Sequence, residues 1–94
     1  MTTHRLKLHE DYFEAVKHGI KTFEIRYNDR NFKVGDELDL MLYRRTGKKT
    51  VFDEDIMQVC QENHFKVVVT YILTHEEFPI GIPEGYVCMA IRVV

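Results

Sequence analysis

One stretch of this chain, Gly19-Ile20-Lys21-Thr22-Phe23-Glu24-Ile25-Arg26, predicts where a helix ends and a strand begins. Its first residue suits the position after a helix, because glycine readily adopts the left-handed backbone that ends many helices. The following residues alternate in character, and successive side chains of a strand point to opposite faces. One face is predicted to pack on a core, while the other holds polar side chains. The two sets are Phe23, Ile25 and Tyr27 for the core face, and Glu24, Arg26 and Asn28 for the polar face.

A strand and a short helix are predicted before this stretch. Residues His4–Leu8 alternate in character, with Leu6 and Leu8 on one face, which is typical of a half-buried strand. A helix is predicted over Glu10–His18, because its first turn is acidic and its last turn is basic, as the helix dipole favours. Gly19 is then the residue that ends this helix.

Further strands are predicted along the rest of the chain. The segment Phe65–Leu73 is rich in β-branched residues and is predicted to lie in the centre of the sheet. Phe32 is isolated between two polar turns and is predicted to fold back as an apolar anchor. The other predicted elements are strands at Lys21–Asn28, Leu38–Leu42 and Gly85–Val94, turns at 28–31, 33–36 and Thr46–Lys49, and a loop at Thr74–Glu84.

Residues 50–64 allow two interpretations. Ile56, Met57 and Cys60 have helical spacing, with Asp53 placed to cap a helix. The preceding Thr50-Val51-Phe52 suits a strand instead. The segment is therefore predicted to be an insertion whose structure is left open between these two forms.

One helix and several short strands predict a mostly β (α+β) fold. A length of 94 residues fits a single domain over residues 1–94. We expect a small antiparallel β-barrel with the N-terminal helix packed beside it. Closure of such a barrel would remove the exposed strand edges that promote aggregation.

Charge and composition limit the classes of function. The net charge is −2, so nucleic acid, if bound, must be held by a local basic patch. No apolar run is long enough to span a bilayer and the N-terminus lacks a signal peptide, so a cytoplasmic protein without membrane association is expected. Cys60 and Cys88 lie far apart and the histidines are scattered, so neither a metal site nor a cofactor is predicted.

Several motifs resemble a known family. Gly19-x-Lys21-x-x-Glu24-x-Arg26 matches the GxKxxExR signature of ASCH domains, which belong to the PUA-like superfamily of small β-barrels. Phe32-x-x-Gly35-Asp36 resembles the FxxGD turn of the same superfamily. Further segments resemble an uncharacterised bacterial and phage ASCH-like branch: Leu6-Lys7-Leu8, Tyr12-Phe13, Thr22–Arg26, Asn28-Asp29-Arg30-x-Phe32 and Gly85-Tyr86-Val87.

The resemblance implies a cleft beside the helix, lined by Lys21, Glu24 and Arg26 of the signature. PUA-like domains commonly bind RNA, and ASCH domains are generally proposed to bind RNA or nucleotides. Some ASCH relatives are amidohydrolases that use a Lys and a Thr in this segment, with a Glu from later in the chain. Lys21 matches that Lys, but Glu24 stands at the Thr position, and a carboxylate does not replace a hydroxyl nucleophile. This departure favours binding over catalysis.

Two function hypotheses follow for the polar residues. In the first, the chain is an RNA- or nucleotide-binding module, with phosphate contacts from Lys21 and Arg26, helped by Lys7 and Arg30, while Glu24 orients Arg26 or accepts from a base. In the second, it is a small amidohydrolase or ribonuclease-like enzyme acting on a modified nucleoside or RNA, with Lys21 and Glu24 as acid–base residues.

Each candidate also has a structural interpretation. Glu24 and Arg26 would form an ordinary surface ion pair if their strand face were fully solvated. Asn28 is a candidate rim residue but also a good turn former. Tyr86 is a candidate ring for base stacking, or a core aromatic residue. A protein partner is a third possibility, with residues 52–65 as the surface to consider.

Overall fold

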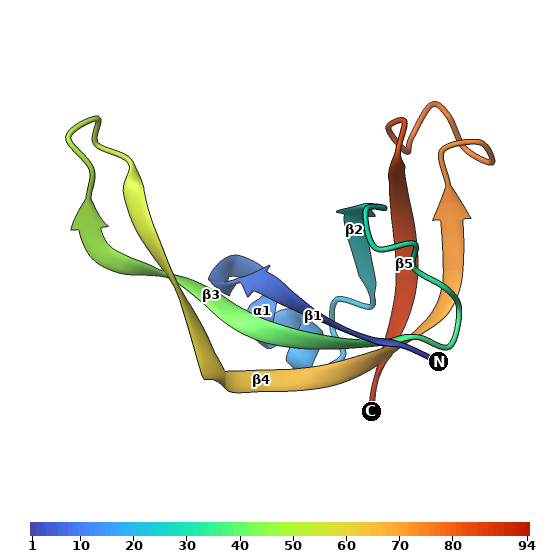
Figure 1. Ribbon diagram of the computed structural model, residues 1–94, viewed down its shortest axis with the longest axis horizontal. Helices are drawn as coiled ribbons and strands as arrows, with labels where there is room; N and C mark the ends of the chain where they lie inside the picture. The colour runs from blue at the N-terminus through green and yellow to red at the C-terminus, as the bar shows by residue number, and fades with distance from the viewer.

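The computed structural model describes residues Met1–Val94 and contains one helix and one five-stranded sheet (Figure 1). The strand order is β1-β3-β4-β5-β2. The predicted mostly β fold with a single N-terminal helix is confirmed, and the predicted central segment lies in the middle strand. The elements are β1 (Thr3–His9), α1 (Glu10–Lys17), β2 (Phe23–Tyr27), β3 (Glu37–Lys49), β4 (Asp55–Thr74) and β5 (Tyr86–Val93).

The sheet is mixed and open, which differs from the expected antiparallel barrel. β1 pairs with β3 in parallel, and the other three pairings are antiparallel. β1 and β2 are the two edge strands, so no backbone ladder closes the sheet. Side chains connect these edges instead: Arg26 Nη2 donates to the Lys7 carbonyl at 2.6 Å, and Arg30 Nη1 donates to the Arg5 carbonyl at 3.4 Å. Two guanidinium groups, one from β2 and one from the turn after it, therefore link this side of the molecule to β1 without a backbone ladder.

β3 and β4 extend beyond their predicted bounds and form an arm that projects from the rest of the molecule (Figure 1). The predicted turn at Thr46–Lys49 is wrong, because these residues belong to β3 and the chain reverses at 50–54. The helical interpretation of residues 55–64 is also wrong, because this segment belongs to β4. Pairing between β4 and β3 satisfies the backbone N–H and C=O groups of both strands. If residues 55–64 formed a short helix, the backbone groups along this edge of β3 would have no partner. Phe52 is 80% exposed at the tip of the arm.

An arginine ties the base of this arm to the start of the helix. Arg45 Nη1 donates to Glu10 at 2.7 Å and to Asp11 at 3.1 Å. The backbone N–H of Arg45 also donates to Glu10, and this bond is the main cause that lowers the pKa of that carboxyl group. The side-chain hydrogen bond from Arg45 lowers the pKa of Asp11. The arm and helix thus meet through charge-assisted hydrogen bonds on the surface.

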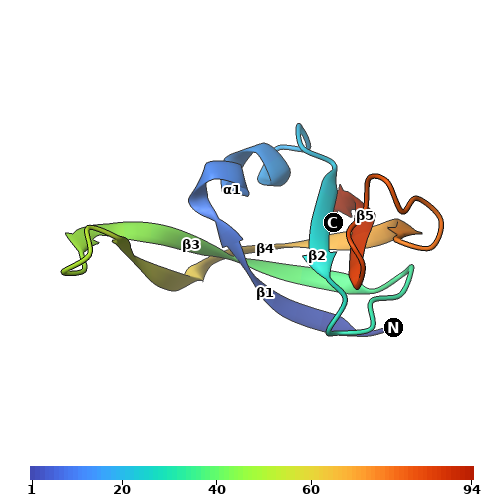
Figure 2. The same cartoon turned by 90° about the horizontal axis from the view of Figure 1, so that it is seen from above.

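The helix ends as predicted and covers part of the sheet. α1 stops at Lys17, and Gly19 has a φ of +73°, the left-handed conformation expected after a helix. Phe13 and Val16 face inward from α1, which lies across one side of the sheet (Figure 2). The Phe13 ring meets the Phe65 ring of β4 edge-on, with centroids 5.1 Å apart. No helix in the structure combines the length and apolarity that crossing a membrane requires.

The core draws on both termini and on the helix. As predicted, β1 buries the face that carries Leu6 and Leu8. Phe32 is 4% exposed, so the predicted anchor is confirmed. The core cluster consists of Leu6, Leu8, Phe13, Val16, Phe32, Leu38, Leu40, Val67, Val69, Val87, Met89 and Ile91.

The two faces of β2 are reversed relative to the prediction. Phe23, Ile25 and Tyr27 are 45%, 51% and 59% exposed, whereas Glu24 is 4% exposed. Arg26 lies on the same inner side as Glu24 and is half-buried. The alternation of side chains along β2 was predicted correctly, but the buried face is the one with the charged residues and not the one with the apolar residues. Ion pairing decided it, because the inward carboxylate is matched by two cations.

Asp36 holds the turn before β3 through a buried hydrogen-bond network. It accepts from the backbone N–H groups of Thr2 and Lys33, and its Oδ2 lies 2.8 Å from His4 Nε2. Burial alone would raise the pKa of Asp36. The hydrogen bonds from His4 and the two backbone groups outweigh burial and hold this pKa below its ordinary value. The ionised carboxylate is therefore the form that stabilises the fold.

We expect Asp36→Asn to lower the free energy of unfolding at neutral pH by about 2–3 kcal/mol, because a buried acceptor for three donors loses its charge. Because the folded pKa is depressed, the contribution of Asp36 is complete above the unfolded pKa of about 4. It disappears as the pH falls through the lower folded pKa. Urea unfolding of wild type and variant as a function of pH measures this difference.

Asp29→Asn is the matched control, because Asp29 is exposed in a turn. We expect it to change the free energy of unfolding by less than about 0.5 kcal/mol. An acid profile of Asp36→Asn that runs parallel to the wild-type profile would contradict the role of Asp36.

Candidate functional site

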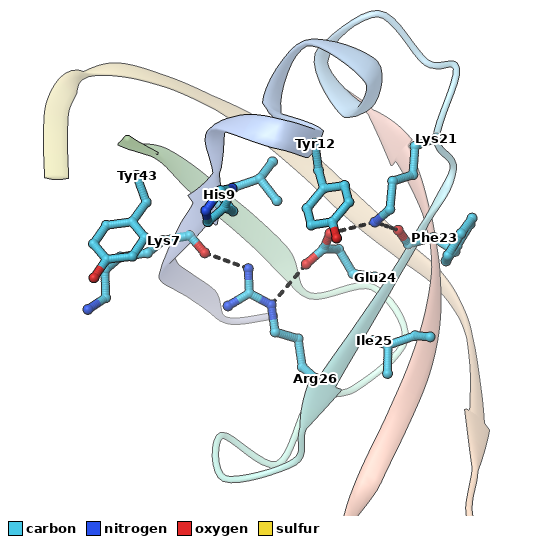
Figure 3. A pocket seen from close by; sticks show the side chains of 10 residues that line it. Lys7, His9, Tyr12, Lys21, Phe23, Glu24, Ile25, Arg26 and Tyr43 are labelled. Carbon is cyan, nitrogen blue, oxygen red and sulfur yellow. Dashed lines mark hydrogen bonds and ion pairs between the residues drawn. The ribbon is translucent and has the colours of Figure 1, made fainter. Parts of the chain in front are cut away.

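A cleft of about 650 Å³ lies between the end of β1, the start of α1 and β2 (Figure 3). The segment Lys21–Arg26 supplies one wall, β1 and the helix supply the opposite wall, and β3 contributes a tyrosine. The lining residues are Lys7, Leu8, His9, Tyr12, Lys21, Phe23, Glu24, Ile25, Arg26 and Tyr43. Four of the seven predicted ligand-binding residues, Lys7, Lys21, Glu24 and Arg26, therefore come together in one cleft.

Glu24 is the buried centre of this cleft. Its Oε1 accepts from Lys21 Nζ at 3.1 Å and its Oε2 accepts from Arg26 Nε at 2.9 Å. The Glu24 side chain is 5% exposed, while those of Lys21 and Arg26 are 20% and 25% exposed. Glu24 and Arg26 therefore do not form the fully solvated surface ion pair that was the alternative to a functional site. A carboxylate removed from water keeps its charge only where such partners surround it.

Arg26 links the two walls of the cleft. One edge of its guanidinium donates to Glu24, and Nη2 donates to the Lys7 carbonyl on β1 at 2.6 Å (Figure 3). A planar guanidinium has five N–H donors in a fixed geometry, so these two bonds hold the group and leave its other donors available. Arg26 is therefore partly buried and oriented by Glu24, with further N–H donors that could meet an anion.

Aromatic and imidazole rings surround the cations. The Lys7 ammonium lies 4.8 Å from the centre of the Tyr43 ring, and the Lys21 ammonium lies 5.1 Å from that of Tyr12. The His9 ring stands between the two tyrosines, with its centroid 6.3 Å from Tyr12 and 6.5 Å from Tyr43. The cleft thus combines positive charge with flat rings.

Sequence reasoning did not identify His9, Tyr12 or Tyr43 as site residues. Tyr12 follows the start of the helix and is 50% exposed. Tyr43 reaches the cleft because the parallel register of β1 and β3 places it opposite His9. That pairing joins residues distant in the sequence, so no local pattern reveals it.

Three predicted ligand-binding residues lie outside the cleft. Asn28 Oδ1 accepts from the Phe32 backbone N–H at 2.9 Å, which gives this side chain a structural role in the loop. Tyr86 lies on the outer side of the sheet, where its ring packs against Tyr27 with centroids 5.5 Å apart. Arg30 lies in an adjoining depression of about 520 Å³ that shares Lys7 and Arg26 with the cleft.

The charge of the cleft suits the binding of an anion. Three cations and one carboxylate line the cleft, which gives it a formal charge of +2 in a chain of net charge −2. The lining contains no Ser, Thr or Cys to act as a nucleophile. No group of three His, Cys, Asp or Glu side chains is arranged to hold a metal ion.

We expect Glu24→Gln to destabilise the fold by about 2 kcal/mol or more, because Lys21 and Arg26 lose the charged partner of a mostly buried ion pair. Denaturant unfolding at neutral pH measures this loss. Glu14→Gln is the matched control, because Glu14 forms an exposed pair with His18 and should matter by less than about 0.5 kcal/mol. Equal stability of the two variants would show that Glu24 is not the centre of a stabilising cluster.

Comparison with known proteins assigns the chain to a family. No curated protein matches the sequence. A family model described as a domain of unknown function (DUF3850) matches residues 3–91. The matched range includes α1, β1 to β4 and most of β5, together with every residue that lines the cleft. The chain therefore belongs to the DUF3850 family.

Proposed function

We propose that this chain is an RNA- or nucleotide-binding module and that its ligand occupies the cleft around Glu24. The observation that carries this proposal is the concentration of three cations around a single buried carboxylate in an otherwise acidic chain. Such a local field attracts phosphate even where the net charge of the molecule does not. Lys7, Lys21 and Arg26 contact phosphate, and Glu24 orients the last two.

The cations retain donors for a ligand. Lys21 Nζ donates to Glu24 and to the Phe23 carbonyl, which leaves one of its three N–H groups. Arg26 retains the donors that Glu24 and the Lys7 carbonyl do not use. The Lys7 ammonium stands over the Tyr43 ring, and its side chain makes no ion pair. All three cations line the cleft, so these donors are available to a ligand that occupies it.

The rings and the size of the site support a nucleotide rather than a simple anion. Tyr12 is half exposed beside the cations and offers a face on which a base can stack. A volume of about 650 Å³ lies within the usual range for small-molecule sites. The adjoining depression adds Arg5 and Arg30 beyond Arg26, so a second phosphate of an RNA chain has cations to meet it.

The sequence resemblance supports the same proposal. The residues that match the ASCH signature are Lys21, Glu24 and Arg26, and these are the residues that build the cluster at the centre of the cleft. We include in the proposal that the chain is an ASCH-type, PUA-like module acting in the cytoplasm, where RNA and nucleotides are its ligands. Its open sheet is then a PUA-like arrangement whose edges are joined by arginine side chains.

Lys7→Gln gives the cleanest test, because Lys7 makes no ion pair and its loss leaves the Glu24 cluster intact. We expect the variant to bind a labelled single-stranded RNA several-fold more weakly, with unchanged stability. With three phosphate contacts, the wild-type affinity should fall with salt with a logarithmic slope of about −2, and Lys7→Gln should reduce that slope by about 0.7. Fluorescence anisotropy over a range of salt concentrations measures both values.

Lys48→Gln removes the same charge from the arm, away from the cleft, and should leave affinity and slope unchanged. Equal effects of the two substitutions would mean that RNA responds only to overall charge, and this would contradict a specific cleft. Calorimetric titration with mononucleotides, run in parallel, separates a nucleotide ligand from an RNA ligand.

The hydrolase hypothesis makes a different prediction. Both oxygens of Glu24 already accept hydrogen bonds from cations, which favours a positioning role over proton transfer. We therefore expect no turnover of acetylated cytidine or of short RNAs, measured by chromatography of the products. Turnover by wild type that is lost in Glu24→Gln, with the variant still folded, would establish catalysis instead.

A further inference from the structure

We infer that the outer side of β2, β5 and β4 packs against the same surface of a second copy of this chain. This surface, the aromatic face, is defined by Phe23, Ile25, Tyr27, Tyr71, Tyr86 and Cys88. The inference rests on this outer surface and not on the identity of the cleft's ligand, although Phe23 and Ile25 also border the cleft.

Strand register places these side chains in rows across three strands. Phe23 of β2 and Tyr71 of β4 are both paired with Ala90 of β5, so they flank it in one row. Ile25 is paired with Cys88 in the next row. Tyr27 and Tyr86 form the third row and contact each other edge to face. Residues that are paired across strands share a face, so the rows form one continuous apolar surface.

This surface reverses the usual pattern of a sheet with one solvated side. Such sheets place apolar side chains inward and polar ones outward, whereas β2 turns Glu24 inward and Phe23 and Ile25 outward (Figure 3). Once the cleft requires Glu24 and Arg26 on the inside, polar residues could fill the outer positions at no cost to the core. Aromatic and aliphatic residues stand there instead, which indicates that the outer side is covered in the functional state.

The aromatic face is built rather than incidental. Gly85 has a φ of +82°, and a Cβ atom at this position would lie 2.7 Å from the Tyr27 ring. The Asn28 backbone N–H donates to the Gly85 carbonyl at 2.8 Å, which fixes the turn against the end of β2. Glycine at this turn therefore makes room for Tyr27 to lie beside Tyr86. The chain accommodates an exposed aromatic pair at this position.

The charge pattern of the aromatic face is compatible with a copy of the chain as the partner. The side chains of the three rows are uncharged, and the charges that border them lie at the rim: the Lys21 ammonium is 4.6 Å from the centre of the Phe23 ring, Glu76 lines a depression beside Tyr86, and Arg92 is the next outward position on β5. A face with so few cations, all at its rim, offers little to a phosphodiester backbone. Two identical faces with uncharged centres meet there without repulsion, and an isologous dimer about a two-fold axis needs only one such face.

The exposed area is sufficient for a weak dimer. Phe23, Ile25, Tyr27, Tyr71 and Tyr86 are between 39% and 59% exposed. Since a large side chain of this kind buries about 200 Å², these five leave roughly 500 Å² per copy and roughly 1,000 Å² for a dimer. That is near the lower limit for a specific interface, so dimerisation should depend on concentration. It would also cover β2, an edge strand paired by backbone only with β5, from the side opposite the cleft.

Sedimentation velocity of the wild-type chain over about a hundredfold range of concentration tests the inference. We expect the mass to rise from 11.2 kDa toward twice that value. Ile25→Lys places a charge at the centre of the aromatic face and should keep the chain monomeric throughout. Val51→Lys, at a 96% exposed position on the arm tip, is the matched control and should dimerise like wild type. Circular dichroism at low concentration confirms that each variant is folded.

Tyr71→Lys on β4 should also keep the chain monomeric. It replaces Ile25→Lys in the test if Ile25→Lys fails to fold. A short bifunctional thiol reagent should also join two chains through Cys88, which is on the aromatic face, and Cys88→Ser should abolish the joined product because Cys60 is buried. A wild-type chain that stays monomeric at every concentration would overturn the inference and leave the face to a different partner. Dimerisation that survives both lysine substitutions would place the interface elsewhere.

Discussion

The buried carboxylate of Glu24 is the constraint on which the rest of this structure depends. It sits 4% exposed in a strand at the edge of the sheet, where an unpaired charge would cost several kcal/mol. Lys21 and Arg26 supply the compensating charges, and Arg26 reaches onward to the Lys7 carbonyl of the other edge strand. One ion-pair cluster therefore fixes the orientation of β2 and spans the gap between the edges of the open sheet.

The same constraint gives the molecule two different surfaces from one strand. With Glu24 and Arg26 inward, the positive cleft forms between β1, the helix and β2. The alternation of the strand then forces Phe23, Ile25 and Tyr27 outward, beside the outward residues of β5. The proposed ligand site and the inferred dimer surface thus lie on the two sides of β2 and adjoin at Phe23 and Ile25, which also border the cleft. A shift of β2 by one residue along β5 would turn Phe23 and Ile25 inward and Glu24 outward. Such a shift would therefore disrupt both surfaces at once.

Much of the fold follows from local patterns. The charges at the two helix ends, together with Gly19, predicted the position of α1. The alternation of His4–Leu8 predicted β1, and the run of β-branched residues predicted the central part of β4. Local patterns failed where long-range pairing decides the outcome. Residues 55–64 have helical spacing but pair with β3, and Thr46–Lys49 resembles a turn yet continues a strand. Tyr43 lies at the cleft because β1 and β3 pair in parallel with His9 opposite Tyr43, and the residues next to Tyr43 in the sequence do not reveal this pairing.

By itself, the sequence determined the periodicity of β1 and α1, the residues that alternate on β2, and the grouping of Lys21, Glu24 and Arg26 in one short segment. These follow from backbone geometry, which acts between neighbours in the chain. Only the tertiary structure decided which face of β2 is buried, that the sheet stays open, and which rings join the cations. Those outcomes depend on burial and on partners distant in sequence, such as the Lys7 carbonyl for Arg26 and the His9–Tyr43 pairing. A charged side chain turns inward only where the folded chain brings its counter-charges together.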